Sequence, residues 1–294
     1  MHAAEHAVTP RTARALIAEQ VPELAGLGLR RVGREGTDSV LYRVGPGHIA
    51  RFPRLPGAEA QIDRAARWLP ALAPHLPLEV PRIGRIGAPG LGYPFRWTLG
   101  PWVAGRDAFA APAPDQMGVA ASVADFLIAL HSLPCPQGAP LRGAADRMDH
   151  LLAGLDPFIA GFEGEADQGV LRRRVAEAAR EVPEYRAAPV WVHGDLHPLN
   201  LLTRRGRLSG VIDWGTMGLG DPGMDLMVGW TLLDPPARRL LRERLRPDPA
   251  AWARGRALAL AKAIMAIPYY RRSNPVFHAA MKRTLERILQ EAEG

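Results

Sequence analysis

Hydrophobic and polar residues alternate differently in the two parts of this chain. In the first hundred residues, short β-prone runs are separated by glycine-bearing turns, which predicts strands. One helix is predicted between the third and fourth strands, because Ile62, Ala65, Leu69 and Leu72 recur at helical spacing. The strands are predicted at Leu29–Val32, Ser39–Val44, His48–Phe52, Arg82–Ile86 and Tyr93–Leu99. This part is therefore expected to be a small sheet carrying one main helix.

Helical periodicity dominates after Gly105. Helices are predicted at Met117–Leu133, Val170–Val182, Ala250–Ile267 and Asn274–Gln290, the last two broken by Pro268 and Pro275. Inside this helical part, three short β-prone runs form an exception. They are Val190–Val192, Leu199–Thr203 and Leu208–Ile212, and a hairpin turn at 204–207 is predicted to join the last two.

Polar residues that can do chemistry are concentrated around these three runs. Asp195 lies in the loop after the first run, Asn200 begins the second, and Asp213 ends the third. The hairpin returns the chain, so Asn200 and Asp213 are expected at one end of the ladder. A carboxylate with an amide oxygen suits Mg²⁺, and Asp195 would be free to act as a base. Capping of turns and helices is the alternative for each residue alone.

The segment HGDLHPLN, followed by IDW and then DPGMDL, resembles the catalytic loop and metal-binding aspartate of the aminoglycoside phosphotransferase family, relatives of the protein kinases. The resemblance covers most of the chain. It implies an α+β, two-lobed, protein-kinase-like fold, with a small antiparallel-sheet N-lobe and a mainly helical C-lobe. It also implies lobe boundaries at 1–100 and 106–294, with a connector at 101–105.

The same resemblance implies a role for each site residue. Asp195 would be the catalytic base, and Asn200 and Asp213 would hold Mg²⁺ between the phosphates of ATP or GTP. Arg51 stands where the family has a phosphate-binding lysine, and arginine can also bind phosphate. The carbonyl of Pro101 and the N–H of Val103 would meet the adenine edge.

The chain departs from the family pattern on the predicted N-lobe helix. The family lysine pairs with a helix glutamate, and Ala65 occupies the expected place of that glutamate. Glu59 could substitute only if the helix is shifted or the arginine reaches further; otherwise it is an exposed acid favourable to the helix dipole. The segment from Gly33 to Ser39 could cover phosphates with its N–H groups, or be a plain hairpin turn.

Composition excludes several classes of protein. The net charge is +7, but the 37 basic residues, of which only Lys262 and Lys282 are lysines, are scattered and not interleaved with aromatics, so no nucleic-acid partner is expected. No apolar stretch predicts a membrane span or a signal peptide. A single cysteine, Cys135, forms no intramolecular disulfide. A cytoplasmic location fits these features, while oligomeric state is left open.

The expected partners are a nucleotide and a small-molecule hydroxyl acceptor. An aminoglycoside-type antibiotic is the first expectation, because the acidic stretch DPFIAGFEGEAD could attract a polycation. The basic and apolar segment 250–270 favours instead a neutral, anionic or macrolide-like acceptor, or another metabolite. A kinase-like binding protein without turnover is a further alternative. A metallophosphoesterase is a rival interpretation, but the sequence lacks the other metal-binding motifs of such enzymes. A zinc site formed by His193, Asp195 and His197 is a still weaker hypothesis.

Overall fold

The computed structural model describes residues 6–32, 39–142, 148–182, 185 and 187–291. The chain forms two compact units, each described here by itself. The first comprises residues 1–74 and 79–103, and the second comprises residues 75–78 and 104–294. Each unit has a hydrophobic core of its own.

The first unit is built on a five-stranded sheet in the order β1-β2-β3-β5-β4, with every neighbouring pair antiparallel. Its strands are β1 (Leu29–Arg31), β2 (Ser39–Val44), β3 (His48–Pro53), β4 (Arg85–Gly87) and β5 (Trp97–Pro101). Alternation along the central strands buries Tyr42, Ala50 and Phe52 on one face. Arg51 therefore lies on the other face.

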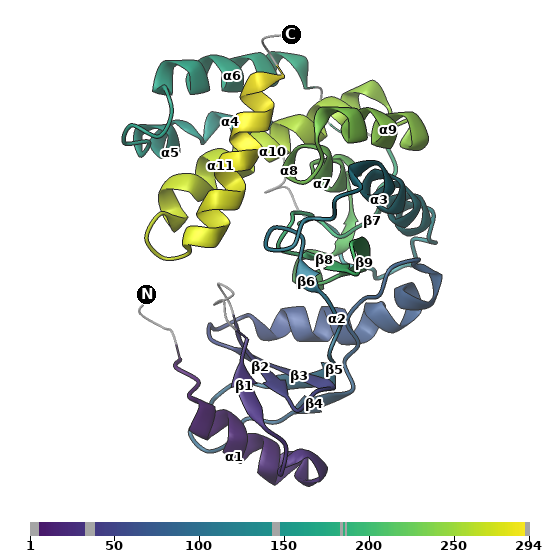
Figure 1. The fold of residues 1–294 in the computed structure, drawn as a ribbon, viewed down its shortest axis with the longest axis vertical. Helices are drawn as coiled ribbons and strands as arrows, with labels where there is room; N and C mark the ends of the chain where they lie inside the picture. The colour runs from purple at the N-terminus through teal and green to yellow at the C-terminus, as the bar shows by residue number, and fades with distance from the viewer. Residues whose placement is uncertain (1–5, 33–38, 143–147, 183–184, 186, 292–294) are drawn as a thin grey trace. The chain divides into compact units, whose positions relative to one another are not determined.

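Two helices of the first unit lie on opposite faces of this sheet (Figure 1). Helix α1 (Pro10–Gln20) begins with the Thr9 hydroxyl accepting from the Thr12 N–H and with a proline at its first position. Its Leu16 and Ile17 pack on the face that holds Phe52. Helix α2 (Glu59–Leu72) lies on the face of Arg51. A short 3₁₀ turn, Pro22–Leu24, follows α1.

The second unit is mainly helical. Its longest helix, α10 (Pro249–Tyr270), packs against α4, α5, α6, α7, α8 and α11 and forms the centre of the core. The other helices are α3 (Gln116–His131), α4 (Met148–Ala153), α5 (Asp156–Ala160), α6 (Gln168–Glu181), α7 (Gly223–Leu226), α8 (Val228–Thr231), α9 (Pro235–Leu245) and α11 (Pro275–Gln290).

Short strands of the second unit position the polar residues Asp195, Asn200 and Asp213. Strand β7 (Val190–Val192) pairs with β10 (Gly218–Gly220), and β8 (Leu201–Arg204) pairs with β9 (Arg207–Val211) and β6 (Arg106–Asp107). The hairpin turn predicted between β8 and β9 is confirmed. Arg205 and Gly206 both have positive φ, at 53° and 74°, as a two-residue hairpin turn requires.

One prediction about prolines is wrong. Pro268 does not break the C-terminal helix, since α10 continues through it to Tyr270. The proline lies in the last turn, so it removes a single backbone hydrogen bond close to an end that frays in any case. Pro275 instead starts α11 at its first position, after the Asn274 side chain caps the helix by accepting from the Phe277 N–H.

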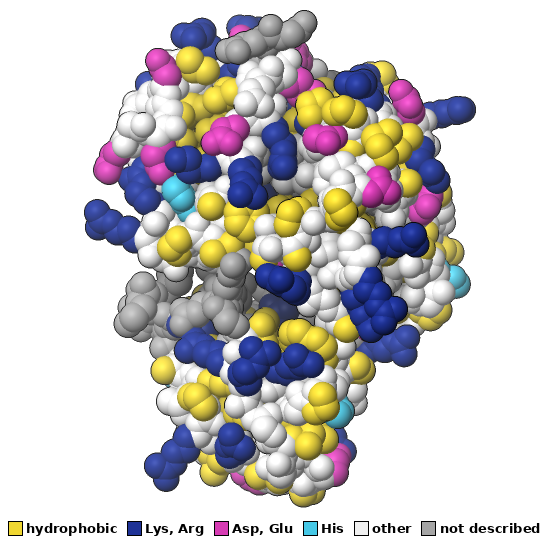
Figure 2. Space-filling model, viewed as in Figure 1, with side chains coloured by type: hydrophobic (Ala, Val, Ile, Leu, Met, Phe, Trp, Pro, Cys, Tyr) yellow, Lys and Arg dark blue, Asp and Glu magenta, His cyan; other side chains and the backbone are white. Residues whose placement is uncertain are grey.

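The predicted α+β fold, with a small antiparallel sheet in the N-terminal part and helices in the C-terminal part, is confirmed. On the face shown in Figure 2, basic side chains are interspersed with acidic and apolar ones rather than gathered in one stripe. No helix within the described ranges combines the length and apolar character that a membrane span needs.

Candidate active site around Asp195

A buried carboxylate holds the loop that follows β7. Asp225 of α7 is fully buried, and its two oxygens accept from the backbone N–H of His193 (3.0 Å) and of Gly194 (2.8 Å). The Nε2 atom of His131, from α3, lies 3.1 Å from Asp225 Oδ2. Gly194 has a φ of +78°, which favours glycine. Asp225 therefore shapes the loop from within α7.

The side chain of His193 also supports this loop, through contacts of both ring nitrogens with the backbone. It is fully buried; its Nδ1 accepts from the Asp195 N–H (3.2 Å), and its Nε2 lies 3.0 Å from the carbonyl of Ile212. These partners place the ring proton on Nε2 and keep the ring neutral. Burial lowers the pKa of His193, against the opposing charge of Asp225. Both ring nitrogens are thus used within the protein.

Asp195 presents its carboxylate at the end of this loop, with about a quarter of its side chain exposed (23%). Lys262 of α10 donates from Nζ to Oδ1. The amide of Asn200 donates to Oδ2 (3.2 Å), and His197 Nε2 lies 3.4 Å from the same oxygen. Burial raises the pKa of Asp195, but the charges of Lys262 and His197 outweigh it and hold that pKa well below its ordinary value.

Two features of this cluster differ from what the sequence suggests. Lys262, 67 residues away along the chain, carries no sequence signal beyond being one of two lysines. His197 is interpreted from the sequence as a loop residue near the mouth of the site. It is instead buried, with its ring 5.1 Å from that of Phe277.

Asn200 and Asp213 are brought together by the β8–β9 hairpin, as predicted. The Ile212 N–H donates to the carbonyl of Asn200 (2.9 Å), and Asp213 is the next residue. Asp213 is exposed and has a left-handed backbone, with φ 63° and ψ 66°, which is uncommon outside glycine and recurs at functional sites. The Nδ2 atom of Asn200 donates to the Asp195 carbonyl (2.9 Å), which turns its amide oxygen away from that loop.

The donor chemistry of this pair fits a hard cation. One carboxylate and one amide oxygen leave the other positions of Mg²⁺ to phosphates and water, which is how Mg²⁺ is usually bound. Within the described ranges, no three His, Cys, Asp or Glu side chains cluster as metal ligands. The alternative zinc site at His193, Asp195 and His197 therefore has no support, since both nitrogens of His193 already have protein partners.

In the first unit, Arg51 and Glu59 each reach a different partner. Arg51 donates from Nη2 to Gln61 Oε1 (2.8 Å) and from Nε to the Ser39 hydroxyl (3.0 Å). Glu59 Oε1 accepts from the N–H (2.8 Å) and the Nε (3.1 Å) of Arg96. Glu59 therefore does not take the place of the family's glutamate beside Arg51. The helix residue that Arg51 meets is Gln61, which the sequence analysis did not single out.

The remaining predicted residues lie at the end of the first unit. Pro101 ends β5 opposite His48, and the following Trp102 N–H donates to the Gly47 carbonyl (2.8 Å). The first unit ends at Val103, a buried residue, within the predicted connector 101–105. The predicted glycine-bearing segment between β1 and β2 lies, apart from Ser39, outside the described residues.

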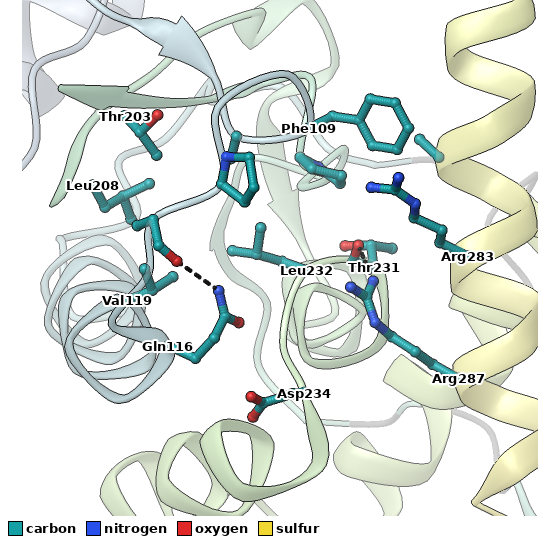
Figure 3. A pocket seen from close by; sticks show the side chains of 15 residues that line it. Phe109, Gln116, Val119, Thr203, Leu208, Thr231, Leu232, Asp234, Arg283 and Arg287 are labelled. Atoms are coloured by element: carbon teal, nitrogen blue, oxygen red, sulfur yellow. Dashed lines mark hydrogen bonds between the residues drawn. The ribbon is translucent and has the colours of Figure 1, made fainter. Parts of the chain in front are cut away.

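A separate cavity of about 150 Å³ lies in the second unit (Figure 3). Arg283 and Arg287 of α11 enter it from one side, with Arg283 over the ring of Phe109 at 4.4 Å. Gln116 lies on the opposite side, and Asp234 lies below Leu232 in this view. Asp195, Asn200 and Asp213 do not line it. Its volume is below the roughly 300 Å³ at which small-molecule pockets usually begin.

The whole fold is shared with antibiotic phosphotransferases of known structure. The chain aligns with the GDP complex of an aminoglycoside 2'-phosphotransferase at a TM-score of 0.73 and 18% identity, covering 97% of this chain and 100% of the other. A GDP and kanamycin complex of a related enzyme gives 0.70 and 18%, covering 95% and 98%. A macrolide 2'-phosphotransferase from Brachybacterium faecium gives 0.60 and 21%, covering 94% and 97%. At these identities the likeness shows the fold.

Sequence comparisons give the family. An Escherichia coli aminoglycoside 3'-phosphotransferase is 28% identical in an alignment of 151 positions that covers 47% of this chain and 53% of that protein. The match thus spans about half the length of this curated relative. The model of the phosphotransferase enzyme family matches residues 29–258, which is well over half of the chain and includes both Arg51 and the Asp195 loop. The chain therefore belongs to the phosphotransferase enzyme family.

Proposed function

We propose that this protein transfers the γ-phosphoryl group of ATP or GTP, bound with Mg²⁺, to a hydroxyl group of a small molecule. The observation that carries the proposal is the state of Asp195. Its carboxylate is held as an anion at the end of a clamped loop and remains partly exposed, as an acceptor of a substrate proton must be.

In the proposed reaction, Asp195 accepts a hydrogen bond from the acceptor hydroxyl and orients its oxygen toward the γ-phosphorus. The bond between this oxygen and phosphorus forms as the bond from phosphorus to the β–γ bridging oxygen breaks. The hydroxyl proton passes to the Asp195 carboxylate, and the nucleoside diphosphate leaves. Positioning and charge neutralisation supply most of the catalysis in such transfers.

Asn200 and Asp213 are proposed to hold Mg²⁺, which would neutralise the phosphate charge. Arg51 is proposed to bind the nucleotide phosphates, with Gln61 and Ser39 orienting its guanidinium. The carbonyl of Pro101 and the N–H of Val103 are proposed to meet the base. Glu59 is left out of the nucleotide site, because its carboxylate is engaged by Arg96.

The test is nucleotide consumption with Mg²⁺ across a panel of aminoglycosides, macrolides and small hydroxylated metabolites. Asp195→Asn is expected to lower turnover by about 10²–10⁴-fold while nucleotide affinity stays within about twofold. The control is Asp125→Asn, which changes an exposed aspartate on α3 paired with Arg244. Equal turnover of wild type and Asp195→Asn would contradict the proposal.

The same assay distinguishes the proposed phosphotransferase from the alternative of a binding protein without turnover. That alternative draws on Ala65, which occupies the expected place of the family's helix glutamate and has no group that could pair with Arg51. Mg²⁺-dependent nucleotide binding with no transfer to any acceptor of the panel, and no release of nucleoside diphosphate, would favour it.

A further inference from the structure

Lys262 lies directly against the proposed catalytic base. It projects from the middle of α10, and its Nζ donates to Asp195 Oδ1. The same ammonium lies 5.7 Å from the ring centroid of Phe277 on α11. About a quarter of the Lys262 side chain is exposed (24%). A cation is therefore accessible at the place where an acceptor hydroxyl must bind.

The distance from this ammonium to any substrate follows from hydrogen-bond geometry. A hydroxyl that donates to Asp195 is one hydrogen bond from the carboxylate, and Lys262 is one hydrogen bond from it on the other side. The reacting oxygen is then within about 6 Å of Nζ. An ammonium group next to the reacting hydroxyl would face Lys262 at similar range, and the Asp195 carboxylate that could attract it is already paired with Lys262.

In the acidic stretch before α6, which is expected to attract a polycation, Glu163 and Glu165 are paired with basic side chains of the protein. Glu165 accepts from Arg271 (2.7 Å), and its other oxygen lies 2.7 Å from His278 Nε2. Arg271 also donates to Glu163 (3.1 Å). These contacts tie the acidic stretch to the end of α10 and to α11.

Three further carboxylates of the second unit also have partners within the protein. Asp156 pairs with Arg172 (2.7 Å), and Asp167 caps α6 by accepting from the Val170 N–H (2.9 Å). Glu291 binds the indole N–H of Trp230 and the guanidinium of Arg238. Glu291 therefore stabilises the packing of α11 on α8 and α9.

Aromatic rings, rather than carboxylates, continue outward from Asp195. His197 contacts Phe277 with ring centroids 5.1 Å apart, and Phe277 contacts Tyr270 at 4.8 Å. Tyr270 contacts Tyr269 at 4.7 Å, and Tyr269 is exposed. This series of rings offers apolar surface to an acceptor.

We propose that Lys262 determines acceptor specificity by excluding ammonium groups from the neighbourhood of the reacting hydroxyl, so that the acceptor is a hydroxyl compound uncharged in that region and with an apolar face. This inference rests on the proposed phosphotransfer, and of the two acceptor classes expected from the sequence it favours the neutral one over a polycationic aminoglycoside. Kanamycin and its fully N-acetylated derivative form a suitable probe pair, because they share their hydroxyls and differ in charge.

The experiment measures the dissociation constants of both probes, by calorimetry with a non-hydrolysable Mg²⁺-nucleotide present. Wild type is expected to bind the N-acetylated probe more tightly than kanamycin. Lys262→Met should shift this ratio toward kanamycin by about 10- to 100-fold, the size of one like-charge contact at an effective dielectric constant of ~20. Lys262→Arg should keep the wild-type ratio.

The other lysine of the chain, Lys282 on α11, provides the matched control, and Lys282→Met should leave the ratio unchanged. A wild-type preference for kanamycin, or a ratio that Lys262→Met does not move, would overturn the inference, and so would failure of every variant to bind either probe. Nucleotide affinity is measured separately by displacement of a fluorescent analogue. Failure of wild type to bind nucleotide would count against the proposed phosphotransfer. The ratio of the two probe dissociation constants instead tests the role of Lys262 in specificity.

Discussion

Replacing Asp225 with alanine removes the carboxylate that holds the loop of Asp195. The N–H groups of His193 and Gly194 then lose their acceptor, at a place where the Asp225 side chain is fully buried. A buried donor left without a partner costs about 1–3 kcal/mol, so two such donors cost about 2–6 kcal/mol. His131, the third partner, is partly exposed and can turn to water.

This loss is large relative to the 5–15 kcal/mol by which a typical domain is stable. Asp225→Asn is expected to lose less, because the amide oxygen still accepts from one N–H while its NH₂ group faces the other donor. Urea unfolding followed by tryptophan fluorescence measures the difference. Trp191 lies in the strand before this loop and the ring of Trp214 lies 4.9 Å from that of His193, and both are buried.

Asp234→Ala is the matched control. Asp234 caps α9 by accepting from the Ala237 N–H at 2.9 Å, and loss of such a cap costs about 1 kcal/mol. If Asp225→Ala unfolds with a free energy no lower than that of Asp234→Ala, the carboxylate does not hold the loop, and the reasoning is refuted. Turnover should also fall with Asp225→Ala at temperatures where the protein stays folded.

Three further predictions concern the nucleotide and the pH dependence of stability. Asp213→Ala is expected to abolish the Mg²⁺ dependence of nucleotide binding, measured by titration with and without Mg²⁺; an unchanged dependence would show that Asp213 is no ligand. Arg51→Ala is expected to raise the nucleotide dissociation constant by about tenfold or more, whereas Arg51→Lys should keep part of the affinity, and a nucleotide-bound structure with Arg51 turned from the phosphates would contradict this. Burial opposes ionisation of Glu165, but Arg271 and His278 outweigh it and lower its pKa below the ordinary 4.5, so its contribution to stability is complete above pH 4.5 and is lost as the pH falls through the lowered pKa. The free energy of unfolding of wild type in urea should therefore exceed that of Glu165→Gln above pH 4.5, and this difference should shrink as the pH falls below about 4.5. A difference that stays constant across that range would disprove the linkage.

Local pattern was sufficient for most of the fold. The alternation in β2 and β3 predicts which face of the sheet is buried, because side chains of a strand point to opposite sides in turn. The spacing of Asp195, Asn200 and Asp213 around one hairpin predicts that the last two lie together, since a two-residue turn leaves the chain little choice of return. In the same way, Thr9 and Pro10 predict where α1 begins.

Pairings between distant segments were decided only by the tertiary structure. The sequence shows that Glu59 and Gln61 both lie near the start of α2, but the packing of that helix on the sheet decides that Arg51 meets Gln61 and Arg96 meets Glu59. Spacing along the chain does not predict which side chains pair, because a long side chain can reach several partners and packing selects one.

Lys262 shows the same limit at the candidate active site. Its helical pattern predicts α10, but a helix can bury any of several faces, and only its packing among α7, α8 and α11 turns Lys262 toward Asp195. The sequence by itself thus determined which loop is the candidate catalytic loop and which family the protein belongs to. The charge beside the Asp195 carboxylate was decided by tertiary packing, because it depends on which helix face meets the loop.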